Sequence, residues 1–175
     1  MTILVIILVI LALVLIRAYF LTDELVIEKD ILINKTAAEV FNYIKFVKNS
    51  ENYSKWVMMD PNMKKEYKGT DGTVGFVYSW DSTNKNVGKG EQEITKITNN
   101  RVDWEIRFIK PFENTSTSYM TTDSVSPTQT KVAWVFQGPR TYFMKLIHFL
   151  LNLKKMLGND LNTGLTNLKS VLEKQ

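Results

Sequence analysis

The chain has 175 residues, enough for one domain with a short extension. Its hydrophobic fraction of 45% is ordinary for a globular protein, which excludes the disordered and collagen-like classes. The net charge of +4 comes from lysines spread along the chain, a pattern too weak and too scattered to indicate a nucleic-acid partner. The absence of cysteine excludes disulfides, thiol catalysis and cysteine-ligated metals.

The chain begins with an apolar segment. Every residue from Ile3 to Ile16 is apolar, and residues 18–21 extend the run beyond Arg17. A spanning helix needs about 20 such residues, which residues 1–21 supply if Arg17 extends to the lipid headgroups. A cleaved signal peptide would need a basic start and a small-residue cleavage site, and both are missing. A buried core helix would need a polar face.

We therefore expect residues 1–22 to form a transmembrane anchor and residues 23–175 to form a separate domain. Tyr19 and Phe20 would lie at the membrane interface, where aromatic side chains are common. The one flanking cation, Arg17, lies on the domain side. The positive-inside rule then predicts a single-pass membrane protein whose domain is cytoplasmic.

The domain begins with a β-branched strand over residues 25–33. Thr36 and Glu39 have the spacing of a capping box and predict a helix start. A second short helix is expected over residues 48–55. Alternating apolar residues then predict a series of antiparallel strands, clearest at Val102, Trp104, Ile106 and Phe108. The expected strands cover residues 63–68, 74–80, 88–97, 101–110, 113–125 and 131–136.

From Thr141 onward, leucines spaced three or four apart predict one long amphipathic helix. Gly158 and Gly164 interrupt this pattern, which usually signals close packing or a bend. A curved sheet with an aromatic face must bury that face, and the leucine stripe is the evident partner. A bent sheet around a helix often leaves an apolar cavity.

This order of elements resembles the helix-grip fold of the START and birch-pollen-allergen-like proteins, the SRPBCC superfamily. It is most similar to the polyketide cyclase/dehydrase-like branch. The segments that carry the resemblance are 35–44, 53–56 with 60–61, 74–80 with 88–94, and 158–161 with 164–169. The resemblance implies an α+β fold, with a curved antiparallel sheet wrapped around a long C-terminal helix. It also implies a cavity for a hydrophobic small molecule, but no single reaction, because the superfamily includes carriers, sensors and cyclases.

Large aromatic side chains are the main candidates for lining such a cavity, although they could equally form a filled core. We expect Thr115, Thr117 and Thr121 to add hydroxyls beside Tyr119 on the same inner face. The predicted ligand-binding residues are Trp56, Phe76, Tyr78, Trp80, Trp104, Phe108, Tyr119, Trp134, Phe136 and Leu161.

The sequence predicts no catalytic residue, metal or cofactor. His148 is the only histidine and has no evident orienting partner or co-ligands. Glu91 and Glu93 could form an acid/base pair. The favoured interpretation is that they lie on a solvated outer face and pair with nearby lysines. No nucleophile elbow or phosphate-binding loop is present.

Three functions remain open. The favoured one is a membrane-anchored domain that binds a lipid or other hydrophobic small molecule in an internal cavity. The first alternative is a polyketide cyclase/dehydratase-like enzyme, which would need Tyr119, Glu93 or His148 inside the cavity. The second is a membrane-tethered protein-interaction module, which would have a filled interior and an exposed apolar patch.

Overall fold

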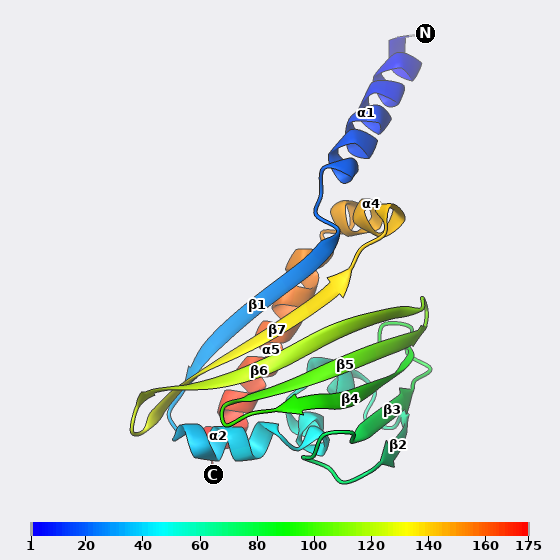
Figure 1. Cartoon of the computed structure of the whole chain (residues 1–175). Coiled ribbons are helices and arrows are strands. Elements are labelled where there is room, and N and C mark those ends of the chain that lie inside the picture. The colour runs from blue at the N-terminus through cyan, green and yellow to red at the C-terminus, as the bar shows by residue number, and fades with distance from the viewer. Residues whose placement is uncertain (1, 175) are drawn as a thin grey trace.

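The computed structural model describes residues 2–174, apart from the side chains of residues 148 and 149. An apolar helix stands apart from a seven-stranded antiparallel sheet, and a long helix packs on the inner face of that sheet (Figure 1). The strands are β1 (Glu24–Ile33), β2 (Lys64–Lys68), β3 (Val77–Asp81), β4 (Lys89–Ile97), β5 (Arg101–Lys110), β6 (Asn114–Ser126) and β7 (Gln129–Pro139). The helices are α1 (Thr2–Tyr19), α2 (Ala37–Ile44), η1 (Val47–Asn52), α3 (Lys55–Met59), α4 (Tyr142–Leu150) and α5 (Leu153–Glu173).

The strand order is β1-β7-β6-β5-β4-β3-β2, so the first strand pairs with the last. Register shifts within the β4–β5 and β6–β7 pairs mark irregularities that increase local twist. The sheet bends around α5, while α2, η1 and α3 close the space below its concave face (Figure 1). This arrangement gives the cavity a curved wall and a helical floor.

The predicted capping box forms at the start of α2. The Glu39 backbone N–H donates to the Thr36 hydroxyl at 3.2 Å, and the Glu39 carboxylate accepts from the Thr36 backbone N–H at 2.9 Å. Two backbone donors that a helix start leaves unpaired are thereby satisfied. The helix buries Val40 and Ile44 beneath the sheet.

Close packing between α5 and the sheet confirms the prediction made from the helix glycines. A Cβ atom on Gly164 would lie 2.7 Å from a ring carbon of Trp134, so a larger residue would displace the ring. Gly158 packs in the same way against the Lys29 side chain of β1. Leu161, Leu165 and further leucines of the stripe are buried beside them. The glycines therefore let α5 approach the sheet closely.

The prediction of one continuous C-terminal helix was wrong. The helix breaks between α4 and α5 at Asn152, whose φ of 49° is left-handed. Asparagine is among the few non-glycine residues that adopt this conformation readily. The leucine spacing continues through the break, so the pattern alone could not reveal it. Leu150 and Leu151, directly before the break, are 61% and 64% exposed.

Helix α1 is long and apolar enough to cross a membrane, and among Thr2–Tyr19 only Val14 and Ala18 are not exposed in this structure. Its end is joined to α4, because the Tyr142 hydroxyl donates to the Leu15 carbonyl at 2.9 Å. The composition of α1 agrees with the predicted anchor, although a signal sequence has similar properties.

The segment between α1 and β1 is held by two cations. The Arg140 guanidinium donates to the Thr22 carbonyl and the Glu24 carbonyl, both at 2.8 Å. The Lys145 ammonium lies 2.5 Å from an Asp23 carboxylate oxygen, and this hydrogen bond and charge hold the pKa of Asp23 below its usual range. These contacts fix the direction in which α1 leaves the domain.

Replacing Gly164 with alanine tests the close approach of α5 to the sheet. We expect Gly164→Ala to lower the free energy of unfolding by about 1–3 kcal/mol, because the added methyl group forces the Trp134 ring to move. Denaturant unfolding of the detergent-solubilised full chain measures the change. Asn162→Ala, at an exposed position on the same helix, is the matched control and should unfold like the parent chain. Equal stability of both variants would contradict the packing described.

Candidate functional site

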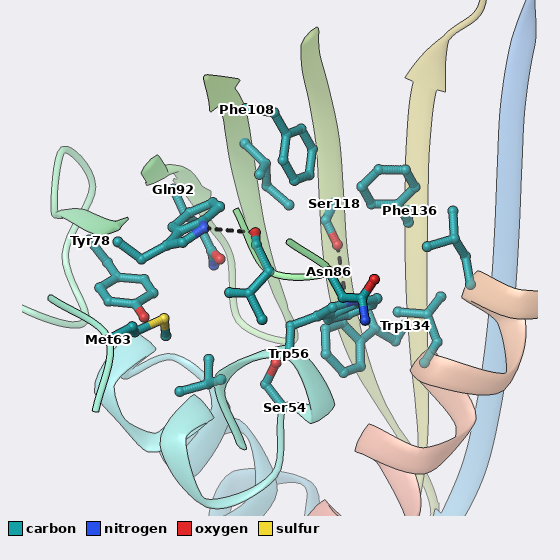
Figure 2. Close-up of a pocket in the computed structure, with 16 residues that line it drawn as sticks. Ser54, Trp56, Met63, Tyr78, Asn86, Gln92, Phe108, Ser118, Trp134 and Phe136 are labelled. Carbon is teal, nitrogen blue, oxygen red and sulfur yellow. Dashed lines mark hydrogen bonds between the residues drawn. The ribbon is translucent and has the colours of Figure 1, made fainter. Parts of the chain in front are cut away.

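A cavity of about 240 Å³ lies between the concave face of the sheet, α3 and the first turns of α5 (Figure 2). Its walls come from five of the seven strands and from the β3–β4 loop. The lining residues are Ser54, Trp56, Val57, Met63, Tyr78, Trp80, Asn86, Val87, Gln92, Ile106, Phe108, Ser118, Trp134, Phe136, Leu157 and Leu161.

A second space of about 80 Å³ adjoins the first at its inner end. The two share much of their lining, including Tyr78, Gln92 and Trp134. The smaller space extends towards Trp104 and Tyr53. The cavity therefore has a wide outer part and a narrow inner part.

No lining residue of either space carries a charge at neutral pH. The polar side chains among them are serines, Asn86, Gln92 and the polar ends of the aromatic residues. Burial raises the pKa of the Tyr78 hydroxyl well above its ordinary value, so this group stays protonated. The site can thus bind through apolar contact and neutral hydrogen bonds.

Two donors at the inner end have no hydrogen-bond partner within the described chain. They are the Tyr78 hydroxyl and the indole N–H of Trp104, both on residues at most 5% exposed. Leaving a buried donor unpaired costs about 1–3 kcal/mol, so such groups usually meet water or a ligand. Both residues line the narrow inner space.

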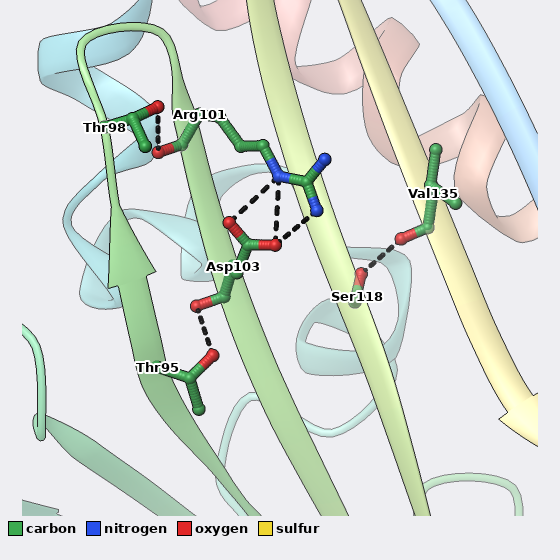
Figure 3. A network of polar contacts seen from close by, with 6 residues as sticks. All are labelled: Thr95, Thr98, Arg101, Asp103, Ser118 and Val135. Carbon is green, nitrogen blue, oxygen red and sulfur yellow. Dashed lines mark hydrogen bonds and ion pairs between the residues drawn. The ribbon is translucent and has the colours of Figure 1, made fainter.

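Three neighbouring polar side chains, those of Ser118, Trp134 and Trp80, are in contrast paired within the protein. The Ser118 hydroxyl donates to the Val135 carbonyl at 2.8 Å and accepts from the Trp134 indole N–H at 3.0 Å (Figures 2 and 3). The indole N–H of Trp80 donates to the Val87 carbonyl at 3.3 Å. Among the described side chains that line the inner space, the Tyr78 hydroxyl and the Trp104 indole N–H are the fully buried donors left without a partner.

The structure places seven of the ten predicted ligand-binding residues on the larger cavity, while ligand binding itself stays a prediction. These seven are Trp56, Tyr78, Trp80, Phe108, Trp134, Phe136 and Leu161. Trp104 lines the adjoining inner space. Phe76 is buried in the core, stacked on Tyr67 with ring centroids 6.2 Å apart, and lines neither space.

Tyr119 does not face inward as predicted. It lies on the outer face of β6, where the Arg101 guanidinium carbon is 3.5 Å from its ring centroid. Figure 3 shows Arg101 on this face, paired with Asp103. Residues 115, 117 and 121 share the outer face, so the predicted row of inward threonine hydroxyls is also wrong.

The inner face of β6 carries Ser116, Ser118, Met120 and Thr122 instead. Both faces of this strand are rich in serine and threonine, so its alternation gives little indication of which face is buried. Met120, the one buried apolar residue of the strand, was the available signal. Sequence reasoning also missed Asn86 and Val87, which a loop brings to the cavity without any periodic pattern.

Glu91 and Glu93 lie on the outer face, as predicted. They form ion pairs with an arginine, however, and not with lysines. The Arg107 guanidinium lies 2.5 Å from Glu91 and 2.8 Å from Glu93, and it also contacts Glu105. These hydrogen bonds raise the pKa of Arg107 above its ordinary value.

Glu93 and Tyr119 therefore face away from the cavity, on the opposite side of the sheet. The side chain of His148, the third acid/base candidate, lies outside the described residues. No group of three His, Asp or Glu side chains suited to a metal ion occurs in the part of the chain that the structure describes.

No protein-family model matches the chain, and no curated protein matches it in sequence. Solved structures do match in fold. The Zhui aromatase/cyclase from Streptomyces sp. R1128 superposes with a TM-score of 0.63 at 10% identity, covering 86% of this chain and 94% of that one.

Two further structures show the same likeness. Norcoclaurine synthase from Thalictrum flavum, in complex with dopamine and hydroxybenzaldehyde, gives a TM-score of 0.62 at 9% identity, covering 87% of this chain and 88% of that one. Ara h 8.0201 gives 0.55 at 12% identity, covering 87% and 99%. The domain thus has the helix-grip fold of the START and birch-pollen-allergen-like proteins, as the sequence predicted.

Removing Arg107 tests the outer-face cluster. We expect Arg107→Met to lower the free energy of unfolding by about 1–2 kcal/mol at neutral pH, because three carboxylates then lie together without a cation. The difference from the parent chain should shrink as acid protonates these carboxylates. Denaturant unfolding at neutral and acidic pH measures both effects.

Lys96→Met serves as the control, because Lys96 is an exposed cation of β4 outside this cluster. It should change stability little at either pH. A loss that is the same at both pH values for Arg107→Met would rule out carboxylate repulsion as its cause.

Proposed function

We propose that this protein is a membrane-anchored helix-grip domain that binds an uncharged lipid or other hydrophobic small molecule in its internal cavity. The observation that carries the proposal is the lining itself, which is aromatic and aliphatic, uncharged, and supplied with two unpartnered donors at its inner end. Small-molecule sites typically combine apolar walls with a few such polar groups.

The lining supports an uncharged ligand. A phosphate or ammonium group buried in the cavity would lose its hydration and meet no counter-charge there. Such burial is costly enough that buried charges are normally paired. The part of the ligand that enters the cavity is therefore neutral.

The volume supports a ligand, or a ligand segment, of modest size. The cavity of about 240 Å³ lies below the range of roughly 300–1,000 Å³ that is usual for small-molecule sites. It suits a ring compound or part of one hydrocarbon chain better than a whole two-chain lipid.

The two free donors support an oxygen acceptor at the buried end of the ligand. The indole N–H of Trp104 can only donate, and the protonated Tyr78 hydroxyl can donate to the same or a neighbouring atom. A carbonyl or ether oxygen would satisfy them. We infer that the ligand enters with such an oxygen directed towards Tyr78 and Trp104.

The other two functions have less support. A protein-interaction module was expected to have an exposed apolar patch, which Phe143, Leu150 and Leu151 supply, but also a filled interior, and the domain has a cavity instead. A cyclase-like enzyme was expected to place an acid/base group in the cavity, and Glu93 and Tyr119 lie outside it. The aromatase/cyclase and norcoclaurine synthase structures support a site for small organic molecules in this fold, and their chemistry is not carried over.

Native mass spectrometry of the full chain, purified from membranes in mild detergent, tests the proposal. We expect a non-covalent adduct of an uncharged, organic-extractable compound. Val87→Trp, which fills the cavity from a loop, should remove it. A parent chain that carries no such compound and takes up none from a total lipid extract would refute the proposal.

Removing the Tyr78 hydroxyl tests whether this donor binds the ligand. We expect Tyr78→Phe to weaken binding of the identified compound by about tenfold, the loss of one hydrogen bond that is buried at the end of the cavity. Tyr119→Phe is the matched control, because it removes the same atom from the outer face. If both variants bind equally well, the assigned role of Tyr78 is wrong.

A further inference from the structure

Helix α4 lies where α1 leaves the membrane, if α1 is the anchor that the proposed function requires. The Tyr142 hydroxyl bonds the Leu15 carbonyl, and Lys145 pairs with Asp23 just beyond α1 (Figure 1). A membrane that contains α1 would therefore have its surface close to α4. This placement comes from contacts within the chain and needs no assumption about the ligand.

Among the described side chains of α4 and of Leu151 directly after it, the most exposed are apolar. Phe143, Leu150 and Leu151 have the i, i+7, i+8 spacing of one helix face and are 61–64% exposed. Among large hydrophobic residues of the described chain after Phe20, only these three and Phe112 are more than 60% exposed. An apolar helix face of this kind, next to an anchor, is typical of a helix lying in a membrane interface.

Phe112 brings a second apolar element to the same end of the domain. It lies at the tip of the β5–β6 hairpin, 71% exposed, next to the exposed Ile109. The register places the start of β6 beside the end of β7, and the end of β7 pairs with the start of β1. The hairpin tip, α4 and the exit of α1 therefore share one end of the sheet (Figure 1).

Exposed cations lie beside these apolar groups, together with one exposed anion, Glu113, directly after Phe112. Lys154 and Lys155 follow Leu151 closely, and Lys110 precedes the hairpin tip, all three being exposed. Lysines placed next to interfacial apolar residues interact favourably with anionic headgroups, each contributing about 1 kcal/mol near such a surface. This charge pattern favours a lipid surface over an apolar protein partner.

The cavity has exposed and partly exposed lining residues at the same end of the sheet. Its buried lining lies deep in the domain, whereas Asn86 is exposed and Phe108, Phe136 and Leu157 are partly exposed. Phe108 is near the end of β5, Phe136 near the end of β7, and Leu157 in the first turns of α5. β5 continues into the hairpin that carries Phe112, and β7 continues towards α4, so the partly exposed lining lies on elements that lead to the hairpin tip and to α4.

We propose that the exposed face of α4 and the tip of the β5–β6 hairpin insert into the surface of the bilayer that holds α1, so that the cavity mouth opens onto lipid. The partner is a phospholipid bilayer with anionic headgroups. The neutral ligand then passes between bilayer and cavity without crossing water. The proposal rests on α1 being a membrane anchor, as stated under the proposed function.

Depth measurements with single nitroxide labels test the proposal. The natural chain has no cysteine, so one introduced cysteine gives one label. The full chain is reconstituted in phosphatidylcholine vesicles with a minority of phosphatidylglycerol. We expect labels at Leu151→Cys and Phe112→Cys to lie about 5–10 Å below the lipid phosphates.

Two further labels distinguish failure of the docking proposal from failure of the membrane anchor. Leu11→Cys reports whether α1 is in the bilayer, and Val125→Cys, exposed at the opposite end of β6, should stay in water. If position 11 is in lipid while positions 151 and 112 are as water-accessible as position 125, the docking proposal fails and the anchor stands. If position 11 is in water, the anchor itself fails. Labels at 151 and 112 that are shielded from both oxygen and the aqueous relaxation agent indicate a protein contact and also overturn the proposal.

Substitutions in α4 test whether its apolar face causes the docking. With the label at Phe112→Cys, the double change Leu150→Gln and Leu151→Gln should raise the accessibility of the label to the aqueous relaxation agent. The change Val74→Gln, at an exposed site elsewhere, should leave it unchanged. Lys154→Glu with Lys155→Glu should have the same effect only when phosphatidylglycerol is present. If the accessibility of the label to the aqueous relaxation agent changes in neither the α4 variant nor the lysine variant, the proposal is contradicted.

Discussion

The position of Trp134 against α5 is the packing constraint on which the cavity depends. Its ring lies against Gly164 on the helix, and its indole N–H is bonded to Ser118 of the next strand. Tyr53 and Trp56 meet it edge-on, with ring centroids 6.0 and 6.1 Å away. A ring held from three directions cannot turn to fill the space beside it. Helix α5 therefore packs closely on the sheet at Gly164, while the cavity lies between the sheet and the earlier turns of α5 at Leu157 and Leu161.

Charge is separated between the two faces of the sheet. The concave face carries no charged side chain in the cavity lining, while the convex face carries Arg107 with its three glutamates and Arg101 with Asp103. The charged side chains pair in contact with water, where an ion pair loses little hydration. The cavity keeps the neutral, low-polarity surroundings in which two hydrogen-bond donors suffice to orient a ligand.

Much of the fold could be predicted from the sequence, because its strongest local patterns agree with the tertiary structure. The alternation in β5 placed Trp104 and Phe108 correctly, and the spacing of Thr36 and Glu39 located the start of α2. The two predictions that were wrong have a common reason. In β6 both faces are polar, and across Asn152 the leucine spacing continues, so in neither place does a local pattern distinguish the structure from its alternative. The loop residues of the cavity could not be predicted, since no period governs a loop.

The pairing of β1 with β7 also bears on how the protein is made. β1 begins at Glu24, a few residues after the end of α1, and Glu24 pairs with Pro139 at the end of β7. The first strand to be synthesised therefore has no partner until the last strand is complete. During this time the apolar helix α1 has already been synthesised. Contacts between distant parts of a chain form slowly, and an unpaired strand is exposed to aggregation meanwhile. If α1 is the anchor proposed above, its early insertion would keep each nascent chain apart from its neighbours until β7 completes the sheet.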